Sequence, residues 1–370
     1  MVRLIEAPGV SIFMSAFRIG PHMVNDGSPM FVIAEVGHNH QGNLETAKKL
    51  FRAAKSAGAQ AVKLQKRDNR VLYTREMYDE PYNSPNAYAP TYGEHRDFLE
   101  FGASEWDELT ALAKELDILF FATPFDLPSV EFLARYDPPA YKTASGDLTN
   151  IPLLKYVASM GKPMLVSTGG AGIDDVRRAH DAVMPINSQL CLLQCTAEYP
   201  AKLGDLNIRV IQTYQREFPD VVTGWSSHDD GTVLAVAAYS VGARVLEKHF
   251  TLDRTMKGTD HKFSLEPHHM AEMVTALGQA REALGSGVKQ RLAEENEAVR
   301  KMGKSLYARH DLPAGHVLTA EDIVWKSPGG KLAPYNLERI IGLRLNRGVS
   351  CETAFTMEML EAVPEAQQVR

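Results

Sequence analysis

Residues 221–251, VVTGWSSHDDGTVLAVAAYSVGARVLEKHFT, contain the pattern that decides the fold of this chain. Two short apolar runs, VVTGWSSH (221–228) and RVLEKHF (244–250), are typical of buried β-strands. Each run has a histidine at its C-terminal end, His228 or His249. Two imidazoles at the same end of neighbouring parallel strands can reach one divalent metal ion and leave positions for water and substrate. The pair therefore predicts a metal-dependent enzyme.

The same alternation of β-rich runs and helical patterns continues back to Phe31. Strands that are each followed by a helix are joined by right-handed crossovers and form a parallel sheet. Eight such units in roughly 250 residues are typical of a (β/α)₈ TIM barrel. A doubly wound open sheet is the alternative, but GHNHQG (37–42) lacks the glycine spacing of a dinucleotide site. The other six predicted strands cover residues 31–37, 61–66, 119–125, 140–145, 163–168 and 190–196.

Three domain segments are expected. The barrel covers residues 18–285, a polar linker with helical content covers 286–304, and a small β-rich domain covers 305–362. Because so small a domain buries little apolar surface, we expect it to dock on its own barrel or on a partner subunit. The second connection, residues 67–103, is long and rich in Tyr, Pro and Asn, which indicates a lid over the catalytic face or a mobile insertion.

Two helix starts are also expected from the pattern. SEWDELTALAKELD (104–117) begins with a capping box in which Asp107 follows Ser104 in place of the usual glutamate. The last barrel helix covers about 267–284, and we expect the His268–His269 pair at its start to lie on the surface.

Composition is that of a soluble globular protein, with 44% hydrophobic and 23% charged residues. A net charge of −6 provides no excess of Lys and Arg to neutralise phosphates, which argues against nucleic acid or an anionic membrane as partner. The three cysteines form no CxxC pattern, and we expect Cys191 and Cys195 to be buried thiols rather than a redox pair. Because Arg3, Glu6 and Arg18 interrupt the apolar N-terminus, we expect no signal peptide and a cytoplasmic location.

Polar side chains gather at the predicted carboxyl ends of the strands, where barrel enzymes have their active sites. Strand alternation puts Lys63 and Gln65 on one face, and Glu247 and His249 on one face. Two buried lysines, Lys63 and Lys142, beside hydroxyl groups and a Gly-Gly turn make a receptor for a small polyanion such as phosphate. His38 and His40 are expected to be hydrogen-bonded or solvated. The strand ends also carry Glu35, Thr123, Ser145, Ser167, Tyr199, Ser226 and His228.

These motifs, in this order, resemble the sialic acid synthase family, whose members condense phosphoenolpyruvate with an N-acetylated aldose such as N-acetylmannosamine and release phosphate. The resemblance implies a transferase with a TIM barrel and a C-terminal antifreeze-like (SAF, β-clip) domain, assembled as a domain-swapped homodimer. It covers about residues 18–360 through IAEVGHNHQGN, VKLQK, FFATPFD, YKTASGD, LVSTGG, LLQCTAEYP, GWSSHDDG, LEKHFT and GTDHKFSLEP.

The resemblance also implies roles for individual residues. His228 and His249 would hold Mn²⁺, with Mg²⁺ or Co²⁺ as alternatives. Glu35 is the candidate for orienting or deprotonating the attacking water, and Lys63, Lys142 and Glu247 are counted with it among the catalytic residues. The groups expected around phosphoenolpyruvate are Lys63, Thr123, Lys142, Ser145, Ser167 and Ser226, and those expected around the sugar are Glu35, Gln65, Tyr199 and Asp260.

Two positions depart from the family pattern. Ala197 stands where the family often has Asn or Ser, which removes a polar contact to phosphoenolpyruvate. In bacterial members an arginine of the small domain reaches the partner's sugar site, and alignment places Ser350 there. Arg344 and Arg347 lie nearby in the sequence, and Arg347 is the predicted sugar-binding residue.

Two other functions remain open at this point. A Schiff-base pyruvate aldolase would use Lys63 or Lys142 as its nucleophile and would need no metal. The two histidines and the paired lysines argue against the aldolase. A non-catalytic sugar-binding or polysaccharide-assembly protein would keep the barrel without turnover, and Ala197 and the missing arginine slightly favour it. The presence of Glu35, His228 and His249 argues against this second alternative.

Overall fold

The computed structural model describes residues 5–7, 10–12 and 15–363, with side chains from residue 15 onward. Arg3 of the expected N-terminal pattern lies outside the described residues. The chain divides into two compact units, Met1–Gly285 and Ser286–Arg370.

The larger unit is built around a closed sheet of eight parallel strands. Hydrogen-bonded neighbours follow the order β7-β6-β5-β12-β11-β10-β9-β8, and β7 also lies beside β8. The first and last strands, β5 and β12, are paired, which closes the sheet into the predicted barrel and excludes the open-sheet alternative. The strands are β5 (Phe31–Gly37), β6 (Ala61–Lys66), β7 (Leu119–Pro124), β8 (Tyr141–Thr143), β9 (Met164–Ser167), β10 (Leu190–Cys195), β11 (Val222–Ser227) and β12 (Val245–His249).

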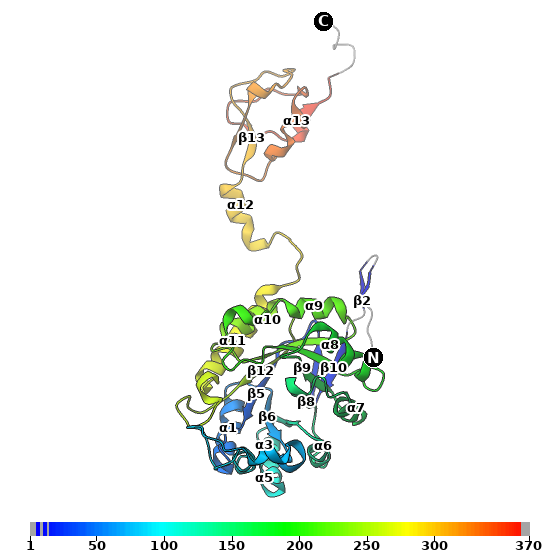
Figure 1. Cartoon of the computed structure of the whole chain (residues 1–370). Helices are drawn as coiled ribbons and strands as arrows, with labels where there is room; N and C mark the ends of the chain where they lie inside the picture. The colour runs from blue at the N-terminus through cyan, green and yellow to red at the C-terminus, as the bar shows by residue number, and fades with distance from the viewer. Residues whose placement is uncertain (1–4, 8–9, 13–14, 364–370) are drawn as a thin grey trace. The chain divides into compact units, whose positions relative to one another are not determined.

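Helices surround the strands on the outside of the barrel (Figure 1). Their apolar residues recur at three- and four-residue spacing, so that Leu50, Phe51 and Ala54 of α1 are all buried. This layer of side chains forms the main core between helices and sheet. The outer helices are α1 (Leu44–Ser56), α5 (Ala103–Glu115), α6 (Leu127–Ala134), α7 (Ile151–Ser159), α8 (Ile173–Val183), α9 (Val210–Glu217), α10 (Val233–Ser240) and α11 (Pro267–Leu284).

The start of α5 differs from the predicted capping box, which was wrong. The N-cap is Gly102, and Ser104 lies within the first helical turn. The Glu105 carboxylate accepts a hydrogen bond of 3.0 Å from the Gly102 N–H. A glutamate three residues after the cap has the length to reach back to the cap N–H, and so it takes the role that the pattern assigned to Asp107.

The N-terminal end of the barrel interior is covered by a hairpin that the sequence pattern did not predict. Its strands, β3 (Ala16–Ile19) and β4 (His22–Asn25), pair antiparallel, and the predicted domain start at residue 18 falls inside β3. Phe17, Ile19 and Val24 are buried against apolar residues of the barrel interior. Those partners are Phe31, Ile33, Ala61, Phe121, Leu165, Leu193, Val222 and Val245. A shorter hairpin, β1 (Ile5–Ala7) and β2 (Val10–Ile12), precedes it.

The second connection folds into three short helices, α2 (Asn69–Leu72), α3 (Arg75–Asp79) and α4 (Tyr92–Phe98). It is tied to the loop that follows β12. The Tyr88 hydroxyl donates to the Lys257 carbonyl at 2.7 Å, and Lys257 Nζ donates to the Ala87 carbonyl at 2.6 Å. These bonds hold the connection at the carboxyl ends of the strands, which is the place expected of a lid.

The smaller unit has its own core, in which Leu306, Leu318, Ile323, Ile340 and Phe355 are all buried. It contains short antiparallel strand pairs and two short α-helices. The first of these helices, α12, lies within the predicted linker. These elements are α12 (Asn296–Met302), β13 (Ser305–Ala308), β14 (Ile323–Lys326), α13 (Leu337–Ile340), β15 (Arg344–Leu345) and β16 (Leu360–Glu361).

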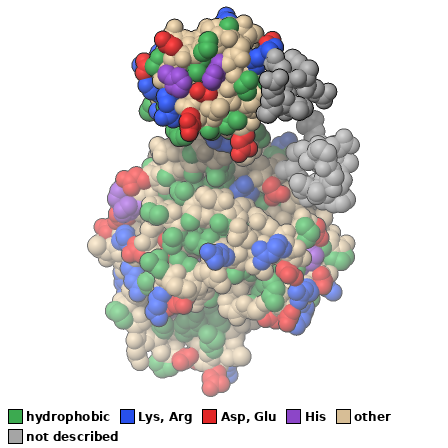
Figure 2. All heavy atoms as spheres, turned by 90° about the horizontal axis from the view of Figure 1, so that it is seen from above, with side chains coloured by type: hydrophobic (Ala, Val, Ile, Leu, Met, Phe, Trp, Pro, Cys, Tyr) green, Lys and Arg blue, Asp and Glu red, His purple; other side chains and the backbone are tan. Residues whose placement is uncertain are grey.

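Charge on the visible face of the larger unit is mixed. Figure 2 shows basic side chains separated by acidic, apolar and other polar groups, with no continuous basic area on that face. This distribution agrees with the net charge of −6. Among the residues that the structure describes, no helix combines the length and apolar character needed to cross a bilayer.

Candidate active site

A cavity of about 750 Å³ opens at the carboxyl ends of the barrel strands. These ends converge in a parallel barrel, so residues far apart in sequence share one cavity. Arg347 belongs to the smaller unit, where it is exposed. All the other predicted site residues line the cavity: Glu35, Lys63, Gln65, Thr123, Lys142, Ser145, Ser167, Tyr199, Ser226, His228, Glu247, His249 and Asp260.

Two lysines and two glutamates form a buried ion network in this cavity. Lys63 Nζ lies 2.7 Å from Glu35 Oε2 and 3.8 Å from Glu247 Oε2, and Lys142 Nζ lies 3.8 Å from Glu247 Oε1. None of the four residues is more than 6% exposed. Charges this deeply buried require partners, and here each ammonium has a carboxylate beside it. The network therefore contains two ammonium groups and two carboxyl groups in contact.

The backbone at the end of β5 allows Glu35 to take part in this network. The β5–β6 register shifts after Glu35, and Gly37 adopts a φ of +53°. A Cβ at position 37 would lie 3.2 Å from Glu35 Oε1 and 3.3 Å from Gln65 Nε2. Glycine is favoured at this position because it accepts the left-handed conformation and leaves room for both side chains.

The pKa values of Glu35 and Glu247 are shifted in opposite directions. Burial raises the pKa of Glu35 to about 7, with a further contribution from Glu247, while Lys63 acts in the opposite direction. Burial also opposes ionisation of Glu247, but Lys142 and Lys63 hold the pKa of Glu247 below its ordinary value. A pair of carboxyl groups separated in this way can provide one proton-transfer group and one permanent negative charge.

Hydroxyl and backbone N–H groups lie beside the lysines. Lys63 Nζ donates to Thr123 Oγ1 at 2.7 Å, and the Gly169 N–H donates to Ser145 Oγ at 3.0 Å. A Cβ at position 169 would lie 2.8 Å from Ser145 Oγ, so only glycine permits this approach. Ser167 Oγ is buried without a hydrogen-bond partner among the described residues. A buried donor without a partner, in a cavity that two lysines also line, is suited to an oxyanion.

His228 and His249 lie side by side at the ends of β11 and β12, with ring centroids 5.4 Å apart. His228 Nδ1 donates to the Thr196 carbonyl at 2.8 Å, which leaves its Nε2 free to bind a metal. His249 Nδ1 is buried, has no hydrogen-bond partner among the described residues and lies 3.6 Å from Asp260 Oδ2. Burial lowers the pKa of both histidines, to about 4 for His228, so both rings are neutral at pH 7.

This donor set fits a divalent cation. Neutral imidazoles are preferred ligands of first-row divalent metals, and the carboxylate of Asp260 beside His249 adds negative charge. Two protein imidazoles would leave the remaining positions to water and substrate, as in other catalytic sites with open coordination.

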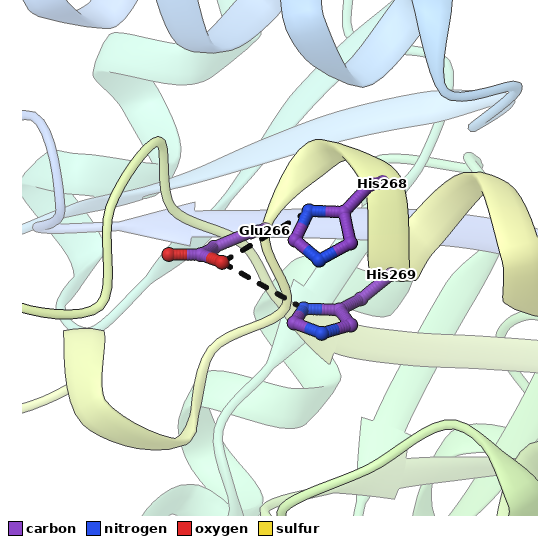
Figure 3. A group of neighbouring side chains, drawn as sticks. All are labelled: Glu266, His268 and His269. Carbon is purple, nitrogen blue, oxygen red and sulfur yellow. Dashed lines mark ion pairs between the residues drawn. The ribbon is translucent and has the colours of Figure 1, made fainter.

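A different group of potential metal ligands lies at the start of α11. Among the described residues, only Glu266, His268 and His269 bring three such atoms within 4.8 Å of one another. Figure 3 shows the Glu266 carboxylate beside both rings, and its Oε2 lies 4.0 Å and 3.9 Å from the Nδ1 atoms of His268 and His269. The His268 side chain is 62% exposed, in agreement with the predicted surface position. The group lies outside the residues that line the cavity.

The residues expected around the sugar complete the cavity wall. Gln65 Nε2 donates to Glu35 Oε1 at 2.9 Å, and the Tyr199 ring lies 4.1 Å from the His228 ring, centroid to centroid. Together with Asp260, these side chains surround the space beside the histidine pair.

Cys195 also lines the cavity, and both it and Cys191 are buried free thiols, as expected.

The second connection contributes a wall of the cavity that the strand ends did not predict. Its cavity-lining residues include Arg67, Tyr88, His95 and Arg96. The two arginines contact His38, which is hydrogen-bonded, in agreement with the expectation for that residue. The sequence signal was the concentration of Arg, His and Tyr in a segment predicted as a lid, but its composition alone did not tell which side chains face the cavity.

The fold and the polar cavity define a (β/α)₈-barrel enzyme with a small appended domain. The chain belongs to the NeuB family, whose model matches residues 50–289, and the SAF domain model matches residues 303–361. The resemblance to sialic acid synthases and the predicted fold are thereby confirmed.

Named relatives cover most of the chain. N-acetylneuraminate-9-phosphate synthase of Mus musculus is 42% identical over 298 residues, which is 80% of this chain and 83% of the relative. N,N'-diacetyllegionaminic acid synthase of Legionella pneumophila is 36% identical over 344 residues, 91% and 96% of the two chains. A crystal structure of N-acetylneuraminic acid synthetase from Leptospira borgpetersenii matches with a TM-score of 0.69 and 31% identity, and covers 77% of this chain and 96% of that one.

Proposed function

We propose that this protein is a nonulosonic acid synthase that condenses phosphoenolpyruvate with an N-acetylated aldose and releases inorganic phosphate. The observation that carries the proposal is the presence, in one cavity, of a buried lysine pair with hydroxyl groups and of two neighbouring neutral imidazoles. The named relatives are synthases of this kind of product.

Phosphoenolpyruvate would occupy the part of the cavity that holds Lys63, Lys142 and the unpartnered Ser167 hydroxyl. Its phosphate and carboxylate are costly to bury without cations, and both lysines are already desolvated. The Gly169–Ser145 contact supports the same placement, because it directs a hydroxyl group to this wall.

The other part of the cavity would hold a divalent cation on His228 and His249. When bound, such a cation supplies Lewis acidity toward a carbonyl oxygen. Mn²⁺ is the proposed ion, with Mg²⁺ and Co²⁺ as alternatives. The neutral state of both rings and the orientation of His228 by the Thr196 carbonyl support this assignment.

The proposed reaction forms one carbon–carbon bond and replaces the carbon–oxygen bond to phosphate by one to water. The enol carbon of phosphoenolpyruvate attacks the aldehyde carbon of the open-chain sugar, and the aldehyde oxygen takes up one proton. Water adds to the carbon that bears phosphate and loses one proton to Glu35, which balances the proton taken up by the aldehyde oxygen. The tetrahedral intermediate then expels inorganic phosphate, which takes the remaining hydroxyl proton, and becomes a 2-keto acid. A carboxylate with a pKa of about 7 beside the Lys63 ammonium is suited to that proton transfer.

The smaller unit would act on a second subunit. We propose a domain-swapped homodimer in which the exposed Arg347 reaches the sugar in the partner's barrel. A reducing, cytoplasmic environment is also proposed, and the free thiols of Cys191 and Cys195 support it.

Phosphate release tests the function. The protein is incubated with phosphoenolpyruvate, Mn²⁺ and one of three aldoses: N-acetylmannosamine, its 6-phosphate or a 2,4-diacetamido-trideoxyhexose. We expect phosphate release that depends on an aldose, with a condensed acid detected by mass spectrometry. No release with any of the three contradicts the proposal. Pyruvate consumption without metal, with borohydride trapping of a lysine, would establish the aldolase instead.

A further inference from the structure

We infer that the acceptor aldose carries a phosphate at the end remote from its aldehyde, and that Arg67 and Arg96 bind this phosphate. The inference rests on the proposed function and names the class of its second substrate. Both arginines come from the second connection, and both line the cavity. They form a second cationic site, separate from the Lys63–Lys142 pair.

The two guanidinium groups lie on either side of one imidazole. Arg67 Nη1 is 3.1 Å from His38 Nε2, and Arg96 Nη1 is 3.3 Å from His38 Nδ1. A guanidinium group only donates hydrogen bonds, whereas a neutral imidazole has one donor and one acceptor nitrogen. Two N–H groups therefore face each other at one of these two contacts. Burial and both arginines hold the pKa of His38 well below its ordinary value, which keeps the ring neutral.

Among the described residues, Glu100 provides the only carboxylate within 4.0 Å of the side-chain nitrogens of Lys66, Arg67 and Arg96. The carboxylate of Glu100 serves both Lys66, at 3.1 Å, and Arg67, at 3.7 Å. Arg96 donates to the Tyr92 hydroxyl at 2.9 Å and 3.1 Å, and no carboxylate of the described residues lies within 4.0 Å of its guanidinium nitrogens. An anion with several acceptor oxygens would supply both the missing charge and the missing acceptors.

The arginine site lies within reach of the proposed catalytic groups. Arg67 Nη2 donates to Gln65 Oε1 at 2.6 Å, and Gln65 Nε2 donates to Glu35 Oε1 at 2.9 Å, so one amide side chain separates Arg67 from Glu35. The carboxylate of Asp260 lies beside His249 and also acts electrostatically on Arg96. A six-carbon sugar with its aldehyde at the histidine pair can therefore extend toward the arginines.

Phosphate fits this site better than a single carboxylate does. Two guanidinium groups offer planar, paired donors in different directions, which match the oxygens of a tetrahedral oxyanion. Asp260 is expected beside the sugar, and its charge acts on Arg96, so the cations of this wall offset it. The named relatives include a synthase of a phosphorylated product and a synthase of an unphosphorylated one. The arginine pair assigns this chain to the phosphorylated class.

The test compares two acceptors at saturating phosphoenolpyruvate and Mn²⁺: N-acetylmannosamine 6-phosphate and N-acetylmannosamine. We expect the wild-type kcat/KM to be on the order of 10- to 100-fold higher for the phosphorylated sugar, the range typical of charged hydrogen bonds. In Arg96→Gln the value for the phosphorylated sugar should fall by a similar factor, while that for the unphosphorylated sugar stays nearly constant. The matched control is Arg70→Gln. Arg70 belongs to the same connection and stacks on Tyr78 at 3.5 Å, but does not line the cavity, so neither value should change.

Equal kcat/KM for both sugars in the wild type overturns the inference while the proposed function stands. An equal loss for both sugars in Arg96→Gln also overturns it, because that pattern indicates a purely structural role. A calorimetric titration of the wild type is independent of variant folding. Glucitol 6-phosphate has no aldehyde and cannot react, yet it should bind more tightly than glucitol, and equal binding contradicts the inference. Absence of phosphate release with both sugars contradicts the proposed function itself.

Discussion

At the scale of single residues, the pairing of Glu35 with Lys63 sets the proton chemistry of the cavity. The carboxylate and the ammonium are 2.7 Å apart, and each residue is only 2% exposed. The effect of burial on Glu35 is larger than that of the ammonium, so the pKa of Glu35 rises to about 7 instead of falling. The group that we propose as base is therefore half ionised near neutral pH.

Glu35→Gln should remove the proton acceptor and lower kcat by about 10²- to 10⁴-fold, the usual contribution of a general base. Because only the carboxylate form accepts a proton, kcat/KM of the wild type, which reports groups of the free enzyme, should rise with pH through about 7. The residual activity of the variant should lack this rise. Steady-state rates of both proteins from pH 5.5 to 9 provide the measurement. A wild-type profile that is flat across this range, or the same rise in the variant, contradicts the role of Glu35.

His249→Ala should abolish Mn²⁺ binding and turnover without unfolding the protein. His249 Nδ1 has no hydrogen-bond partner among the described residues, so removing the ring breaks no such bond at that atom. Equilibrium dialysis measures the bound Mn²⁺, and circular dichroism follows thermal unfolding.

His269→Ala is the matched control, because His269 belongs to the other group of potential ligands (Figure 3). This variant should retain full Mn²⁺ affinity and turnover. If His269→Ala loses the ion and His249→Ala keeps it, the functional metal site is at the start of α11 and not in the cavity.

At the scale of elements, the sequence predicted the barrel strands closely, and the candidate residues at their carboxyl ends line one cavity. Buried parallel strands are apolar along most of their length, and so the runs at 31–37 and 61–66 correspond residue by residue to β5 and β6. Once the strands are known, barrel geometry brings their carboxyl ends together. Glu35, Lys63 and His249 meet for this reason, and no knowledge of loops was needed.

Elements outside the strands were less predictable, for two physical reasons. The hairpin β3–β4 has only four residues in each strand, too few for the alternation of buried and exposed positions to be recognised as a period. Helix α4, YGEHRDF, is polar on most of its surface, so no apolar stripe indicates which side faces the cavity. Arg96 was missed for this reason. Asp260 and Arg347 lie outside the strands and were assigned from the family resemblance alone.

At the scale of the whole molecule, the two units have separate cores, and the predicted sugar-binding Arg347 belongs to the smaller one. Arg347 is exposed within its own unit, and so its side chain is available to another surface. In the proposed domain swap, Arg347 would complete the active site of the partner subunit. The active site of its own barrel would be completed by the small domain of the partner subunit.

Mixing two inactive or impaired variants tests that statement. His249→Ala removes a proposed metal ligand from the barrel site but leaves Arg347 in place. Arg347→Ala removes the proposed sugar-binding arginine from the small domain but leaves the barrel site intact. In a swapped heterodimer, the intact barrel of the second variant receives the intact arginine of the first. After subunits are dissociated, mixed in equal amounts and reassembled, random pairing should restore about a quarter of wild-type sugar-dependent activity at low sugar concentration. If Arg347 acts within its own chain, neither site of the heterodimer is intact, and the mixture shows only the averaged activity of the two parents.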